Sequence, residues 1–136
     1  MSPYNVQDAE LIKVKALPAA GAANYTDAID LGAQSGKQDE LVPNEFEVSL
    51  PATVTLVNTK AITFALQTDN DPAFGSPTTL NAALLVVTGT GGNVSAAASA
   101  RFRLPTNRER YIRVGATVPA DAGTSTAYNY TLKALF

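Results

Sequence analysis

Two groups of side chains in this sequence could do chemistry: a short acidic run and a stretch of arginines. The acidic run is Asp69-Asn70-Asp71. Such oxygen-bearing side chains can ligate calcium, but the run lacks the glycine and the distal glutamate of an EF-hand loop. Aspartate and asparagine also cap turns by bonding to nearby backbone, and we expect that role here, with no metal site. Two alternatives stay open: that Asp69 and Asp71 hold a cation, and that the protein is a hydrolase that uses either carboxylate.

The residue types that are missing exclude the common catalytic constellations. The sequence has no histidine and no cysteine, so the usual serine or cysteine triads, typical zinc sites and disulfide bonds are excluded. The glycine-rich run Thr88–Asn93 lacks the lysine and the helix that follow a phosphate-binding loop. We therefore expect no catalytic residues, no enzymatic activity, no cofactor and no small-molecule substrate.

All the arginines lie in one stretch, residues 100–118, ARFRLPTNRERYIRVGATV. They are Arg101, Arg103, Arg108, Arg110 and Arg113. On both sides of a Pro-Thr-Asn turn, apolar side chains alternate with polar or charged ones, which predicts two strands with one apolar face each. We expect the guanidinium groups to project from the other face of a rigid sheet and to bind carboxylates of a protein partner. A solvated sheet face and a nucleic-acid site are the alternatives.

Charge is sparse and unevenly distributed along the chain. The 136 residues have a formal net charge of −2 and 16% charged residues, whereas about 25% is usual. Residues 1–60 carry four basic and eight acidic side chains, and residues 61–136 carry six and four. An acidic chain with five arginines does not favour nucleic acid. The low charge is typical either of a surface that a partner covers or of a β-rich domain with small polar residues outside.

Period-two alternation of apolar residues recurs along the chain and predicts about eight strands and no helix. The clearest strands are Glu45–Leu50 and Lys60–Thr68. Ala83–Thr88 is strongly apolar, and we expect it to be buried on both faces. Further strands are expected at Glu10–Leu17, Tyr25–Leu31 and Thr126–Phe136 and on both sides of the arginine-rich turn, while Thr53–Val57 is ambiguous. In the last strand, Tyr128 and Tyr130 share the apolar parity, which favours core packing.

These strands predict one all-β domain over residues 9–136, preceded by a polar arm at residues 1–8. Short strands separated by Gly/Pro turns favour a two-sheet sandwich, most simply a jelly roll, with a closed up-and-down barrel as the alternative. Gly32–Pro43 is expected to be a long surface loop and Asp69–Pro77 a turn.

Nothing in the sequence indicates export or membrane insertion. The N-terminal residues MSPYNVQDAEL lack the basic segment and apolar run of a signal peptide. The longest apolar run, Ala82–Val87, is far shorter than a membrane span. The absence of cysteine fits a reducing compartment. We therefore expect a protein that is made in the cytosol and has no membrane partner.

Four motifs occur in a fixed order in the chain. They are Glu45–Leu50, ITFALQTDNDPAF at Ile62–Phe74, SARFRLPTNRERYIRVGATV at Ser99–Val118 and YNYTLKALF at Tyr128–Phe136, and an earlier AIDLG at Ala28–Gly32 fits the same pattern. In this order they resemble the capsid cement (decoration) proteins of tailed bacteriophages. The resemblance implies a jelly-roll-like domain on the outside of an icosahedral head, in the virion, after synthesis in the host bacterial cytoplasm.

The resemblance also implies partners: neighbouring major capsid subunits, which the protein clasps, and further copies of itself in a homodimer or homotrimer. It assigns no contact residue, so the five arginines are candidates on their chemistry alone. A carbohydrate-binding sandwich is the alternative function. Such modules usually present exposed aromatic rings to sugars, and this sequence has no tryptophan.

Overall fold

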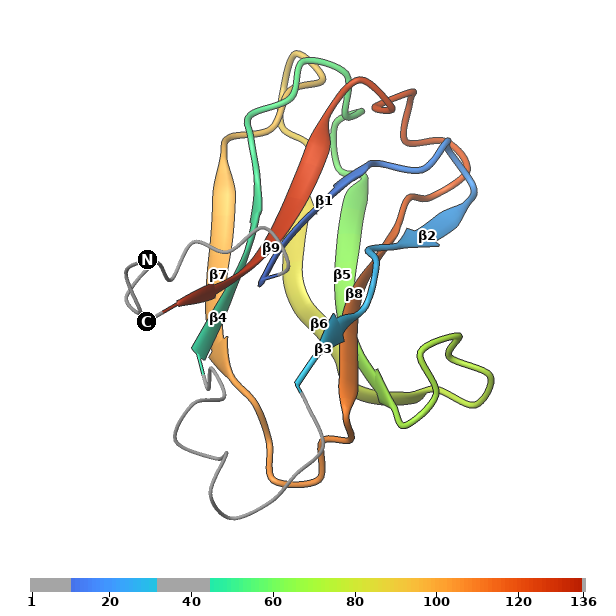
Figure 1. Ribbon diagram of the computed structural model, residues 1–136. Coiled ribbons are helices and arrows are strands. Elements are labelled where there is room, and N and C mark those ends of the chain that lie inside the picture. Colours follow the sequence, from blue (N-terminus) through green and yellow to red (C-terminus); the bar gives the residue numbers. More distant parts are fainter. Residues whose placement is uncertain (1–10, 32–44, 136) are drawn as a thin grey trace.

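Two antiparallel sheets face each other across one apolar core (Figure 1). The computed structural model describes residues 11–31 and 45–135. One sheet contains, in spatial order, β1 (Ile12–Ala16), β9 (Asn129–Leu135), β4 (Glu45–Leu50) and β7 (Ala98–Arg103). The other contains β2 (Ala23–Tyr25), β8 (Tyr111–Thr117), β5 (Ala61–Asp69) and β6 (Thr78–Thr88), and β3 (Ile29–Asp30) also pairs with β8. The predicted two-sheet sandwich is confirmed.

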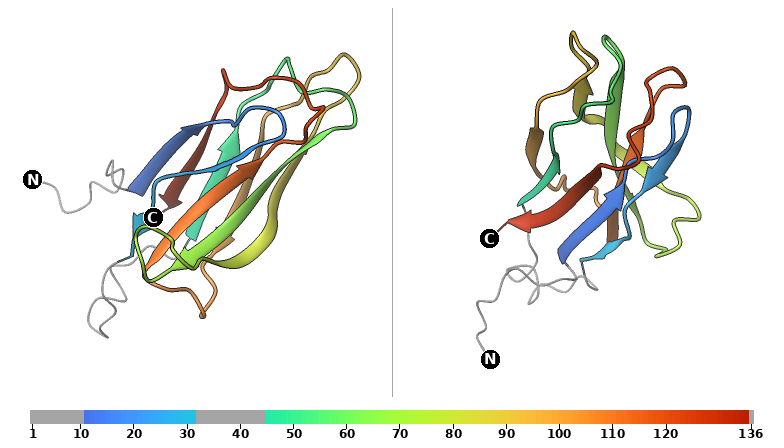
Figure 2. Two further views of the ribbon diagram at one scale, coloured as in Figure 1. Left: turned by 90° about the vertical axis from the view of Figure 1, so that its right-hand side faces the viewer. Right: turned by 90° about the horizontal axis from the view of Figure 1, so that it is seen from above.

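The strand pairing is nested, as in a ribbon that is folded over and wound up. The first strand pairs with the last, β2 and β3 pair with β8, β4 pairs with β7, and β5 pairs with β6, all antiparallel. Nested pairs distributed over two sheets are the jelly-roll arrangement, and Figure 2 shows the two layers from two further sides. The alternative of a closed up-and-down barrel is therefore wrong.

The strand expected at Tyr25–Leu31 is split into β2 and β3. Between them, Thr26 bonds to Val114 through both its backbone nitrogen and its hydroxyl oxygen. The ambiguous segment Thr53–Val57 forms no strand: Thr53 makes an isolated bridge to Ser95, and the backbone nitrogens of Val54 and Val57 donate to the hydroxyl of Tyr128 and to Ala122 O. The predicted arm and the predicted loop Gly32–Pro43 lie outside the described residues. Within the described residues, no helix is long and apolar enough to cross a membrane.

Most of the core is formed by the side chains that the period-two pattern places on one face of β4, β5, β8 and β9. Its largest fully buried members include Phe46, Phe64, Ile62, Ile112, Tyr130 and Leu132. Burial of each such side chain stabilises the fold by about 1.5–3 kcal/mol. The hydroxyl of Tyr130 donates to Asn24 Oδ1 at 2.9 Å, and burial raises the pKa of this phenol. The predicted core role of Tyr130 is confirmed.

The prediction that Ala83–Thr88 is buried on both faces is wrong. This segment belongs to β6, which lies at the edge of its sheet and pairs with β5 alone among the described strands. Val87 is buried, but Val86 is 49% exposed. An apolar run also suits an edge strand that covers the side of the core between the two sheets. Leu84 and Leu85 are partly buried and pack against the core from β6.

The apolar side chains of β1 lie on the outer face of its sheet. The register pairs Ile12 with Lys133 and Val14 with Thr131, whereas Lys13 is paired with the buried Leu132. Val14 is 57% exposed as a result. Alternation alone places Ile12 and Val14 on one face but does not say which face points inward. Because β1 lies at the edge of its sheet, even the side chains on its inward face reach solvent.

Candidate protein-binding surface

The two predicted arginine-bearing strands are present, but they belong to different sheets. Strand β7 pairs with β4, whereas β8 pairs with β5, β2 and β3. The chain therefore crosses from one sheet to the other after the buried Leu104. The expectation that a single sheet carries the guanidinium groups is wrong, because local alternation identifies a strand without identifying its neighbours.

Arg101 and Arg103 project from the outer face of the four-stranded sheet, at its β7 edge. Their side chains are 68% and 76% exposed. Across the strand pair they meet Glu47 and Glu45, with Nε–Oε2 distances of 3.4 and 3.6 Å. Exposed pairs of this kind contribute about 0–1 kcal/mol each. Both guanidinium groups thus keep most of their surface in solvent beside a carboxylate of β4. Glu47 also pairs with Lys133, with an Nζ–Oε1 distance of 3.5 Å.

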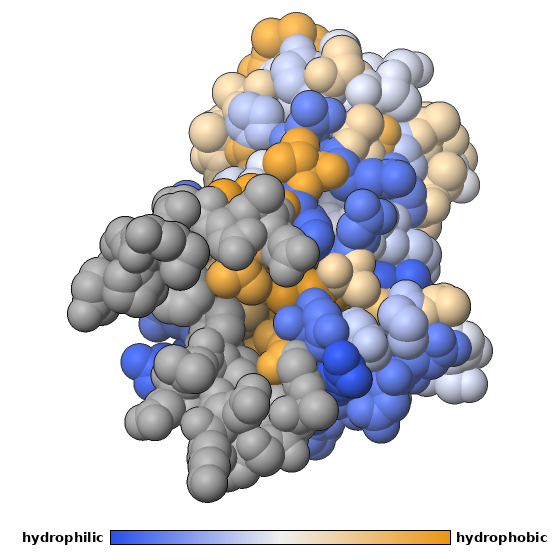
Figure 3. Space-filling view, in the orientation of Figure 1, coloured by the Kyte–Doolittle hydropathy of each residue, from blue (hydrophilic) through white to orange (hydrophobic). Residues whose placement is uncertain are grey.

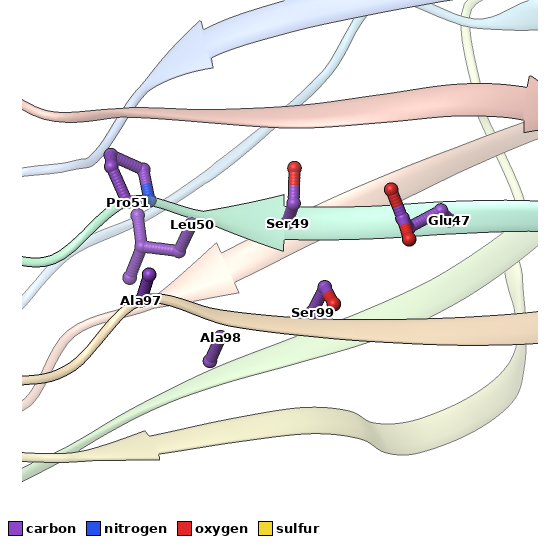
Figure 4. A pocket seen from close by; sticks show the side chains of 7 residues that line it. All are labelled: Glu47, Ser49, Leu50, Pro51, Ala97, Ala98 and Ser99. Carbon is purple, nitrogen blue, oxygen red and sulfur yellow. The ribbon is translucent and has the colours of Figure 1, made fainter.

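The same outer face changes from charged to uncharged along its strands. One row across the sheet is Ile12, Lys133, Glu47 and Arg101, and the row two residues along each strand is Val14, Thr131, Ser49 and Ser99. Beyond the charged row lies a shallow hollow of about 460 Å³, shown in Figure 4. It is lined by Glu47, Ser49, Leu50, Pro51, Ala97, Ala98 and Ser99. These are mostly small side chains, which suit a close-fitting protein surface.

Apolar side chains elsewhere on the surface are scattered. The large exposed ones among the described residues are Val14, Tyr25, Val54 and Val86. On the part of the surface visible in Figure 3, hydrophobic residues lie in several small patches between hydrophilic ones. Scattered apolar residues are normal on soluble domains and do not mark a site. The charged row on the outer face of the four-stranded sheet, which contains Glu47 and Arg101, is therefore the more specific feature.

Arg110 lies in the turn before β8 and forms a two-pronged ion pair within the chain. Its Nε and Nη2 donate to the two carboxylate oxygens of Asp30 at 2.8 and 2.9 Å. The hydrogen bonds to Asp30 raise the pKa of Arg110 above its ordinary value. The guanidinium also lies 5.2 Å from the ring centre of Tyr111. This arginine joins β3 to the turn.

Arg113 lies on the outer face of the other sheet and is held on several sides. Its Nε donates to Gln67 Oε1 at 2.9 Å, and its Cζ lies 3.8 Å from the ring centre of Tyr25 and 4.2 Å from that of Phe74. Burial among these groups lowers the pKa of Arg113. A guanidinium stacked between two rings is well suited to fixing the turn that carries Phe74.

Arg108 differs from the other four arginines. Its Nε is buried and has no hydrogen-bond partner among the described residues. Its backbone nitrogen donates to Pro105 O at 3.3 Å, and the next backbone nitrogen, that of Glu109, donates to Thr68 Oγ1 at 2.7 Å. The turn backbone around Arg108 is thus anchored.

The acidic run caps a turn, as expected. Asp69 accepts from the backbone nitrogens of Ser76 at 2.9 Å and Asp71 at 3.1 Å, and Asp71 accepts from Ala73 at 2.9 Å. These backbone hydrogen bonds, led by that from Ser76, lower the pKa of Asp69. The carboxylate oxygens of Asp69 are directed at the turn backbone. No group of three or more His, Cys, Asp or Glu with metal-binding geometry occurs in the described ranges.

A scan against protein-family models found no match to this chain, and a search of curated proteins found none.

Two partners of the arginines could not be recognised from the sequence alone. The alternation in Glu45–Leu50 places Glu45 and Glu47 on the polar side of their strand. It did not indicate that they lie opposite Arg103 and Arg101, because cross-strand neighbours depend on the sheet order. Gln67, the partner of Arg113, carried no recognisable signal either.

Proposed function

We propose that this chain is a capsid cement protein of a tailed bacteriophage, which binds the outside of the head and ties neighbouring major capsid subunits together. The observation that carries the proposal is the exposed pair Arg101 and Arg103 on an edge strand of a rigid sheet, beside a face of small side chains. The resemblance of four ordered motifs to cement proteins supports the same function. In the structure these motifs supply β4, β5 with its capped turn, β7, β8 and β9.

The proposed action is mechanical. Packaged DNA pushes outward on the shell, and each bound copy links subunits that would otherwise separate. A contact of ordinary size on each subunit suffices, because contacts joined through one rigid body reinforce each other through effective concentration. Self-association into a dimer or trimer multiplies the linked contacts. Exposed guanidinium groups facing shell carboxylates set the orientation and raise the association rate.

The direct test uses expanded phage heads that lack the protein, from the phage that encodes it. Purified protein is added, bound protein is measured by co-sedimentation, and DNA release is followed on heating or in low salt. The proposal expects saturable binding and a higher temperature of DNA release. Equal release with and without the protein contradicts reinforcement. Glycan-array binding in place of head binding favours a carbohydrate-binding module.

A further inference from the structure

Strand β7 has a neighbour on one side only among the described strands. It pairs with β4, and it ends the four-stranded sheet on the side where β6 ends the other sheet. Figure 2 shows these two strands together at one side of the sandwich. The backbone groups of Ala98–Arg103 that point away from β4 have no strand partner in the described part of the chain. Such an edge is a template for a further strand.

The partner that β7 already has shows what kind of strand it accepts. In β4, Glu45, Phe46 and Glu47 lie opposite Arg103, Phe102 and Arg101. The two glutamates pair with the arginines on the outer face. On the inner face, the rings of Phe46 and Phe102 stack with their centres 5.9 Å apart. An acidic–apolar–acidic strand therefore complements β7 on both faces.

A cavity lies beside the inner face of the free edge. It has a volume of about 230 Å³ and is lined by Leu66, Leu80, Asn81, Leu84, Phe102, Arg103 and Pro105. Leu80 and Leu84 come from β6, so the cavity opens between the two edge strands. A strand added to β7 would direct the side chain opposite Phe102 towards this cavity, because alternate side chains of a strand point to opposite faces.

We propose that the free edge of β7 binds an extended segment of the partner protein with an acidic–apolar–acidic pattern. Its backbone continues the four-stranded sheet, its two carboxylates face Arg101 and Arg103, and its central apolar side chain enters the cavity beside Phe102. Main-chain bonds supply affinity in this mode, and alternate side chains supply specificity. The inference rests on the proposed function only in naming the major capsid protein as the source of the segment.

The test uses a synthetic peptide with the sequence of β4, Glu-Phe-Glu-Val-Ser-Leu, and a matched peptide with lysine in place of both glutamates. Amide shifts of the isotope-labelled protein are followed by NMR during titration. The glutamate peptide should cause saturable shifts at Ala98–Arg103 and around the cavity. The lysine peptide should bind about 10-fold more weakly or not at all, since like charges directly opposite each other destabilise strand pairing.

Two double variants separate charge from fold. Arg101→Gln/Arg103→Gln should remove the preference for the glutamate peptide. Lys13→Gln/Lys15→Gln, which removes two charges from the opposite edge strand, should keep it. Circular dichroism establishes that both variants are folded. Glutamate-peptide shifts that avoid β7, or none, overturn the inference, and the arginines then act only as edge charges that oppose strand pairing.

Binding to heads is measured separately, so that the two proposals can fail independently. If the wild-type protein does not bind heads but the peptide binds β7, the proposed function is wrong and the edge site stands. If the protein binds heads and Arg101→Gln/Arg103→Gln binds equally well, the β7 edge is not the contact with the shell, and naming the major capsid protein as the source of the segment is wrong.

Discussion

The guanidinium of Arg113 is stacked between two aromatic rings, and the nearer one is that of Tyr25, whose centre lies 3.8 Å from Cζ. Tyr25 belongs to β2, Arg113 to β8, and the second ring, Phe74, to the turn after β5. One side chain thus joins three separate segments. This distinguishes Arg113 from Arg101 and Arg103, whose side chains are largely in solvent. The arginines therefore divide into those held within the fold and those exposed at its surface.

Replacing Arg113 with alanine should lower the free energy of unfolding by about 1–3 kcal/mol, because a stacked cation and a hydrogen bond to Gln67 are both lost. Arg113→Lys should lose less of the unfolding free energy than Arg113→Ala, since an ammonium group keeps the positive charge although it lacks the planar guanidinium. Arg103→Ala, at an exposed ion pair, should cost less than about 1 kcal/mol. Urea denaturation measures all three. Equal losses for Arg113→Ala and Arg103→Ala would contradict the division of the arginines.

Gly115 makes room for the ring of Tyr25. A Cβ atom at this position would lie 2.6 Å from both Cδ1 and Cε1 of Tyr25, which is its strand partner. Gly115→Ala should therefore displace the ring from Arg113 and destabilise the fold by about 1 kcal/mol. In a Tyr25→Ser background the same change should cost much less, because the clashing ring is gone. Additive losses in this double-mutant cycle, measured in urea, would show that the ring is not the obstacle.

Local patterns in the sequence were sufficient for the strands but not for their neighbours. The alternation in β4 and β5 identified their buried residues, since one face of each strand meets the core. The same kind of pattern left Ile12 and Val14 on an unspecified face, and it assigned the apolar β6 to the interior although it is an edge. Sheet order depends on pairing between residues far apart in sequence, which period-two alternation does not encode.

In the candidate site, too, the sequence predicted the residue types but not their partners in space. Residue type alone selected all five arginines as groups suited to binding carboxylates, without separating Arg101 and Arg103, which the structure places on an exposed edge strand. The engagement of Arg110 with Asp30 brings together residues that are 80 positions apart. No local signal connects these two residues, because the fold alone brings β3 to the turn before β8.

Gly89 should not tolerate a side chain, whereas its neighbour Gly91 should. A Cβ atom at position 89 would lie 2.2 Å from Val57 O and 2.7 Å from Leu56 O, both rigid backbone atoms, while one at position 91 would meet nothing within 4 Å. We expect Gly89→Ala to cost about 3 kcal/mol or more. Gly91→Ala is the matched control and should be neutral or slightly stabilising, as thermal unfolding would show. A similar melting temperature for the two variants would contradict the close approach.

Acid should weaken the turn that Asp69 caps. The pKa of this carboxyl is lowered in the folded state by backbone hydrogen bonds, chiefly from Ser76. Its contribution to stability is therefore present above the unfolded pKa of about 3.9 and is lost as the pH falls through the folded value. Asp69→Asn should lower the melting temperature at pH 7 and reduce its dependence on pH below 4. The exposed Asp27→Asn is the control, and a carboxyl NMR titration of Asp69 with an ordinary midpoint would contradict the assignment.

Salt should separate the surface arginines from the structural ones in head binding. Charges at the rim of an interface act mainly on the association rate and its dependence on ionic strength. Arg101→Gln and Arg103→Gln should therefore slow binding to undecorated heads at low salt and flatten its salt dependence. Arg110→Gln, which breaks the ion pair with Asp30 within the chain, should leave the salt dependence of binding close to that of the wild type as long as the variant is folded.

Association is followed by light scattering between low and physiological ionic strength, where screening shortens the range of exposed charges. If Arg110→Gln slows association at low salt more than Arg101→Gln does, the surface that contacts the head lies at the turn before β8 and not at the β7 edge.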